Sequence, residues 1–111
     1  MLTKLQVLVG MRHLLTKPES WVKGFDALSK EDNSVAPESK EATKFCLVGA
    51  KLHVTGGKNV GYLTQDLFPD LGCVAVWNDD ACRTHAEVLQ KLDEAIARQE
   101  KENASLEPVS D

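Results

Sequence analysis

A short polar cluster near the end of the sequence contains the residue types best suited to binding a ligand. It consists of Trp77, Asn78, Asp79 and Arg83. An aromatic ring, an amide, a carboxylate and a guanidinium beside the start of a helix could hold a small anionic molecule. The same residue types are typical of a structural turn, because Asn and Asp side chains bond to nearby backbone. The sequence favours a turn over 78–80, and the ligand site is the alternative.

A metal site could be assembled from two cysteines and two histidines. They are Cys46, His53, Cys82 and His85. Such a ligand set is a plausible one for zinc. However, seven helical residues separate the first two ligands by about 10 Å, which is too far for both to reach one ion. Cysteine is also a common small buried hydrophobe. We therefore expect no metal and no other cofactor.

Motifs of known enzyme classes are missing from the sequence. It contains no G-x-S-x-G nucleophile turn, no P-loop, no dinucleotide-binding glycine pattern and no H-E-x-x-H zinc motif. Nor does any motif place a nucleophile beside a base and an orienting acid. We therefore expect a protein that is not an enzyme.

The charge balance favours a protein partner over nucleic acid. The 111 residues include 13 Lys and Arg against 17 Asp and Glu, which gives a net charge of −4. Binding to nucleic acid would need a local basic patch despite this acidic total. The residues that could form one are Lys4, Arg12, Lys17, Lys23 and Lys44. A mildly acidic surface suits a basic protein surface better, so we expect another protein as the partner.

The apolar runs and the number of cysteines indicate the cellular compartment of the protein. No run of about 18 apolar residues could form a membrane-spanning helix. Residues 1–15 lack the uninterrupted apolar stretch and the cleavage site of a signal peptide. Three cysteines are an odd number, which suits a reducing compartment. We expect a cytoplasmic protein without a membrane partner.

Length and composition predict one compact α+β domain that is mainly α-helical. Hydrophobic residues make up 42% of the chain and charged residues 27%, which is enough for a single core. The expected domain covers residues 1–103. Residues 104–111 are polar and contain Pro108, so we expect a disordered tail there.

Three main helices are predicted from the spacing of apolar residues. They span about 4–16, 39–54 and 85–102. The middle helix is apolar around most of its surface, so we expect it to be central. Capping boxes, in which two residues three positions apart satisfy each other's backbone N–H groups, mark the starts of the other two. The boxes are Thr3 with Gln6 and Thr84 with Glu87.

Shorter elements complete the predicted fold. Residues 21–36 are expected to form a minor β-hairpin, with strands at Trp21–Leu28 and Val35–Ala36. The apolar run at 73–77 is expected to be a short extended segment. Gly49, inside the central helix, would let another element approach that helix closely.

The order of several motifs resembles a small family of uncharacterised bacterial and phage proteins. The motifs are W-x-x-G at 21–24, F-C-x-x-G-A at 45–50, W-N-D at 77–79, R-T-x-x-E-V-L at 83–89 and L-D-x-A-I at 92–96. The resemblance covers residues 3–98. It supplies no activity, and it implies only a small cytoplasmic protein of bacteria, phages or other mobile elements. Small phage proteins without enzymatic motifs often block or redirect a host protein.

The function that these observations favour is protein binding. We expect a non-enzymatic protein-binding module of bacterial or phage origin, which could inhibit or modulate a host regulatory or defence protein. The alternative is a small-ligand-binding or enzymatic domain whose site is the polar cluster of Trp77, Asn78, Asp79 and Arg83.

Overall fold

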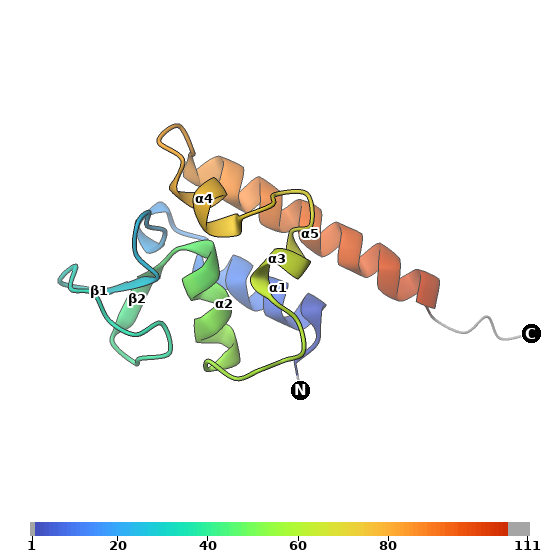
Figure 1. The fold of residues 1–111 in the computed structure, drawn as a ribbon, viewed down its shortest axis with the longest axis horizontal. Helices are drawn as coiled ribbons and strands as arrows, with labels where there is room; N and C mark the ends of the chain where they lie inside the picture. Colours follow the sequence, from blue (N-terminus) through green and yellow to red (C-terminus); the bar gives the residue numbers. More distant parts are fainter. Residues whose placement is uncertain (1, 107–111) are drawn as a thin grey trace, which may run out of the picture.

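The computed structural model describes residues 2–106, and the elements below belong to that part of the chain (Figure 1). In order they are α1 (Lys4–Leu14), the short 3-10 helix η1 (Pro18–Ser20), β1 (Ala27–Ser29), β2 (Ala42–Phe45), α2 (Leu47–Thr55), α3 (Thr64–Leu67), α4 (Val74–Asp79) and α5 (His85–Leu106). Together the helices and the small antiparallel sheet confirm the expected α+β, mainly α-helical class.

Helix α2 is the central element of the fold. It packs against α1, α3, α4 and β2, whereas the long helix α5 packs against α1. Figure 1 shows α5 continuing past the other helices, so that its last turns extend away from the globule. The expected central position of the second main helix is therefore confirmed.

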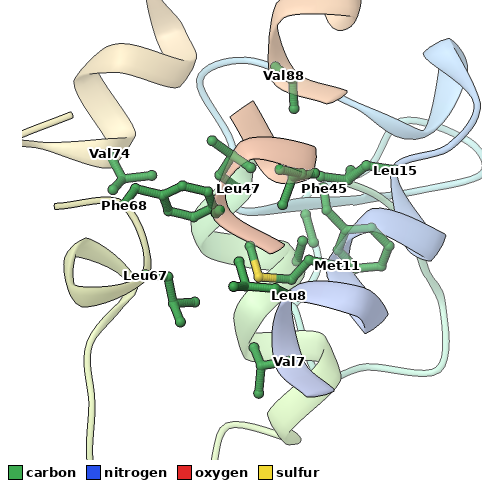
Figure 2. Packing of buried hydrophobic residues seen from close by; sticks show 14 of the residues in the cluster. Val7, Leu8, Met11, Leu15, Phe45, Leu47, Leu67, Phe68, Val74 and Val88 are labelled. Atoms are coloured by element: carbon green, nitrogen blue, oxygen red, sulfur yellow. The ribbon is translucent and has the colours of Figure 1, made fainter. Parts of the chain in front are cut away.

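Apolar side chains from all five α-helices, from both strands and from adjoining residues form one core. The largest fully buried ones are Phe45, Phe68, Leu8, Met11, Leu15, Leu47 and Leu92. Figure 2 labels most of these side chains and shows them gathered between the helices. Burying one such side chain stabilises the fold by roughly 1.5–3 kcal/mol. The core therefore fixes the relative positions of the helices that carry the polar cluster.

The two capping boxes are confirmed. Thr3 N donates to Gln6 Oε1 at 2.9 Å, and Gln6 N donates to Thr3 Oγ1 at 3.1 Å. Thr84 N and Glu87 N make the same exchange, at 2.9 and 3.2 Å. Helix α5 continues to Leu106, beyond the expected end at 102. The remainder of the expected tail, 107–111, lies outside the described residues.

The expected helix over 39–54 is wrong in its first half. Residues 42–45 form strand β2, and α2 begins at Leu47. Cys46 between them has an extended backbone and is the N-cap of α2, since its Sγ accepts the Gly49 N–H at 3.3 Å. Apolar residues three and four positions apart fit a helix. Pairing with a distant strand, which local periodicity does not reveal, decides the conformation here.

The sheet also differs from the expected hairpin over 21–36. Strand β1 covers only Ala27–Ser29, and its antiparallel partner is β2 rather than Val35–Ala36. Contact with the expected partner is limited to its start: a bridge joins Leu28 to Ser34, and Val35 N donates to Ala27 O at 3.3 Å. Strand β2 pairs three of its four residues with β1, which is more than the two that the expected partner could supply.

A backbone segment passes directly over Gly49, as its position in the central helix predicted. Cys46 N donates to Asp26 O at 3.3 Å. A Cβ atom at position 49 would lie 1.7 Å from that same oxygen. The close approach therefore requires glycine.

The expected extended segment over 73–77 is wrong, because α4 occupies this stretch. A short apolar run fits a strand and a helix equally well. Val74 and Asn78, one helical turn apart, are both buried, and α4 packs against α2. The helix includes the first two residues of the expected turn over 78–80, so that only Asp80 of this turn lies outside it.

Across residues 2–106, no helix combines the length and the apolar character that crossing a bilayer needs.

Candidate functional site

The structure brings together the four residues of the predicted polar cluster. Trp77, Asn78 and Asp79 form the end of α4, and Arg83 lies in the loop between α4 and α5. The loop turns back on itself, because Arg83 N donates to Asp80 O at 2.9 Å. The cluster is therefore compact, and its function depends on which polar groups remain available.

Asn78 is a fully buried hydrogen-bonding centre. Its Oδ1 accepts from Trp21 Nε1 at 2.7 Å and from Leu47 N at 3.2 Å. Its Nδ2 donates to Val22 O at 3.1 Å and to Asp79 Oδ1 at 2.9 Å. An amide side chain has two acceptor positions and two donor hydrogens. All four are used within the protein, and the side chain is 0% exposed, so Asn78 cannot contact a ligand.

Asp79 extends this network toward the segment before β1. Its Oδ1 accepts the Gly24 N–H at 2.9 Å as well as the Asn78 amide. Lys23 Nζ donates to Ala81 O at 3.2 Å, just beyond the end of α4. Residues 22–24 therefore lie along the C-terminal end of α4 and are held there by both backbone and side-chain bonds.

Trp77 and Arg83 form a stacked pair. The Arg83 guanidinium lies 3.8 Å from the centre of the Trp77 ring, and its Nε donates to Trp77 O at 2.9 Å. Its Nη1 makes an ion pair with Glu87 at 3.1 Å. A cation stacked on an indole and paired with a carboxylate holds the loop against the start of α5. The hollow that this pair lines is about 220 Å³, smaller than the usual range of ligand pockets.

The four candidate metal ligands are held separately. Cys46 caps α2, and Cys82 is exposed in the loop before α5. The Nδ1 atom of His53 lies 2.7 Å from Pro37 O, and the Nε2 atom of His85 lies 2.6 Å from Leu15 O. Within residues 2–106, no three His, Cys, Asp or Glu side chains are grouped so that they could hold a metal ion.

The three thiols differ sharply in their surroundings. Cys46 is buried, whereas Cys73 and Cys82 are exposed. Burial raises the pKa of the Cys46 thiol to about 11, and the nearby Asp26 carboxylate acts in the same direction. Its reactive thiolate form is therefore scarce at neutral pH. Cys46 is a structural cap, and its chemistry does not suit a nucleophile.

Differential alkylation should separate the three cysteines. Iodoacetamide at mildly alkaline pH should modify Cys73 and Cys82 in the folded protein, because both are exposed. Cys46 should react only after unfolding in concentrated urea. Mass spectrometry of the peptides measures each site. Modification of Cys46 in the folded protein as fast as that of Cys73 would contradict the buried cap.

The basic side chains that were candidates for binding nucleic acid make contacts within the protein. Arg12 Nε pairs with Asp93 at 2.9 Å. The ammonium of Lys44 pairs with Asp32, and that of Lys4 lies over the Tyr62 ring. Lys23 bonds to Ala81 O, as described above, and Lys17 is exposed. Four of the five candidates are therefore held against different parts of the molecule.

Comparison with known proteins shows which family the chain belongs to. The sequence model of one family matches residues 1–98. The chain belongs to DUF6197, a family of unknown function. The expected membership of a family without assigned function is thus confirmed, and the bacterial or phage origin stays a prediction. None of the curated proteins and none of the solved structures matches the chain.

The DUF6197 match ends within α5. Arg98, its last residue, still reaches the globule through an ion pair with Asp70 at 3.7 Å. Beyond it, Gln99 bonds along the helix to Asn103. The family therefore corresponds to the globule with the polar cluster, and the last turns of α5 lie outside the match.

Sequence reasoning missed two features that bear on function. Lys51 is the one charged residue of α2, and it is buried. Its position inside an apolar helix was a visible signal. The indole of Trp21, which satisfies Asn78, lies 57 positions away in the sequence, and no local pattern could have paired them.

Proposed function

We propose that this chain is a non-enzymatic protein-binding module whose contact surface lies on the outer side of α4. The observation that carries the proposal is Val76, which is 70% exposed and the most exposed large apolar side chain of the described residues. Phe25 is 51% exposed. Exposed apolar side chains with a polar surround are typical of protein interfaces.

The α4 patch consists of Phe25, Asp26, Val76, Asp79 and Asp80. Its two halves are held together, because Asp79 Oδ1 accepts the Gly24 N–H directly before Phe25. Val76 precedes Asp79 by three positions on α4, so the two share one side of the helix, and Asp80 follows directly as its C-cap. A shallow hollow of about 540 Å³ adjoins Val76 and both aspartates.

The charge of the α4 patch indicates the chemistry of its partner. Among residues 2–106, no Lys, Arg or His forms an ion pair with Asp26, Asp79 or Asp80. Lys23 nearby donates to a backbone carbonyl instead. A basic protein surface that presents an apolar side chain would complement both features of the patch. We therefore propose such a surface as the partner.

The interior of the polar cluster supports binding over catalysis. Asn78 uses all its bonding positions within the fold, and the Cys46 thiol has a raised pKa. The finer proposal, which rests on the resemblance to bacterial and phage proteins, is that the partner is a host regulatory or defence protein in the cytoplasm. Binding would then inhibit or modulate it.

The test compares two exposed valines. Tagged wild-type protein, Val76→Gln and Val9→Gln are used to capture partners from bacterial lysate, and the retained protein is then purified for affinity measurement. Val9 on α1 is 51% exposed and lies outside the α4 patch, so it is the matched control. We expect Val76→Gln to weaken binding at least about tenfold, as at an interface hot spot, and Val9→Gln to leave it unchanged.

Two further readouts make the test decisive. Affinity for a basic partner should fall with rising ionic strength, because the carboxylates of the α4 patch are exposed. Circular dichroism should show that both variants are folded. Equal binding by wild type and Val76→Gln, or no stoichiometric partner for the wild type, would refute the proposal.

A further inference from the structure

A groove between α2, α3 and the start of α4 contains an unusual lysine. Helix α2 contributes Val48, Lys51 and Leu52, and residues 63–65 and 72–75 complete the lining. Its volume is about 450 Å³, within the range of small-molecule sites. We call this feature the Lys51 groove. It borders the α4 patch but includes neither Val76 nor its aspartates.

The walls of the Lys51 groove are mainly aliphatic. Val48 and Leu52 are half-buried on α2, one helical turn apart, and line the groove together with the buried Val74. Leu63 at the edge is 61% exposed. Such a surface favours the hydrocarbon part of a ligand over water.

Lys51 introduces a positive charge into these walls. Only 8% of the residue is exposed, and its Nζ donates to Tyr62 O at 2.8 Å. The same Nζ lies 5.5 Å from the centre of the Tyr62 ring. The carbonyl belongs to the peptide bond that joins Tyr62 to Leu63, which places the ammonium at the wall that Leu63 forms.

The ammonium lacks a counter-ion. Within residues 2–106, no carboxylate forms an ion pair with Lys51. Asp66 is the acid that acts on it through space, but its Oδ2 accepts the Leu63 N–H at 2.7 Å. Burial lowers the pKa of Lys51, as expected for a desolvated ammonium. One of its three donor hydrogens is used by Tyr62 O, and an anion could accept from the others.

We infer that the Lys51 groove binds a small apolar monocarboxylate. The Lys51 ammonium pairs with the carboxylate, and the aliphatic walls cover the hydrocarbon chain. A buried charge is favourable only when it is paired, so the ligand supplies the partner that the fold leaves out. This site is separate from the α4 patch, and neither depends on the other.

The test uses two probes that differ only in their head group. Octanoate and 1-octanol are titrated into isotope-labelled protein, and amide chemical shifts report binding. We expect saturable shifts at residues 48–52, 63–65 and 72–75. Octanoate should bind at least about tenfold more tightly than octanol, because only octanoate can form an ion pair with the Lys51 ammonium.

Variants assign the preference to Lys51. Lys51→Met keeps an unbranched side chain that is one atom shorter and removes the charge, so it should raise the octanoate Kd about tenfold and leave the octanol Kd unchanged. Lys58→Met makes the same change at an exposed lysine outside the groove and should alter neither. Leu63→Gln, at an exposed position that leaves the core intact, should weaken both probes.

Three results would overturn the inference. They are equal affinity of the wild type for octanoate and octanol, an unchanged octanoate Kd in Lys51→Met, and shifts that map away from the groove. Absence of saturable binding by either probe would have the same meaning.

Discussion

Replacing Asn78 with alanine will lower the free energy of unfolding by roughly 3–6 kcal/mol, a large share of the stability of a domain this small. The substitution removes the partner of three groups, the buried Leu47 N and the partly buried Trp21 Nε1 and Val22 O. Urea unfolding followed by tryptophan fluorescence and circular dichroism measures the loss. Asn103→Ala is the matched control, because Asn103 is exposed on α5, and it should change stability by less than about 0.5 kcal/mol.

The Asn78→Asp variant separates the acceptor bonds of the side chain from its donor bonds. It keeps an oxygen that can accept from Trp21 and Leu47, but it replaces the amide donor that serves Val22 O and places a second carboxylate beside Asp79. The charged form is disfavoured in the folded state, which raises its pKa there, so the loss should be larger at neutral than at acidic pH. If Asn78→Ala costs less than about 1 kcal/mol, the network is not the link between α4 and the 21–24 segment.

The position of Asn78 explains why so polar a motif lies in the interior. One side chain bonds to the segment before β1, to the first residue of α2 and to its own neighbour on α4. The α4 patch depends on this link, because it combines residues of α4 with Phe25. Substitutions that weaken the link should therefore reduce partner binding through a change in shape, without removing a contact residue.

Local signals in the sequence predicted the parts of the fold that depend on neighbours. The capping boxes at Thr3 and Thr84 satisfy backbone groups three residues away, and both helices begin where these boxes placed them. Strand β2 and helix α4 depend on distant partners instead. Periodicity over 42–46 could not reveal the pairing with β1, and an apolar run at 73–77 fits two conformations.

The candidate site divides in the same way. Residue types alone located the Trp77–Arg83 cluster, and the structure places its four members together. The hydrogen bonds of Asn78 depend on Trp21 and Leu47, which lie far away in the sequence. Its buried structural role could therefore not be predicted from the sequence. The charge of Lys51 was visible in the sequence, but its missing counter-ion follows only from the packing of α3 against α2.

Replacing Gly49 with alanine will destabilise the protein by roughly 3–5 kcal/mol, although alanine is the better helix former by about 1 kcal/mol. The new Cβ would lie 1.7 Å from Asp26 O and 2.6 Å from the carbonyl carbon, both backbone atoms. This backbone cannot easily move, because the same oxygen accepts the Cys46 N–H at 3.3 Å and fixes the start of α2.

Gly10→Ala is the matched control for this clash. Gly10 also lies within a helix, but its Cβ would meet the side chain of Val54 at 3.0 Å, and a side chain can rotate away. We expect a change within about 1 kcal/mol there, since the gain in helix propensity offsets the tighter contact. Urea unfolding of both variants measures the difference. A Gly49→Ala variant as stable as Gly10→Ala would mean that the 24–26 segment does not cross α2 at this point, and the α4 patch would then lose the position of Phe25 on which it depends.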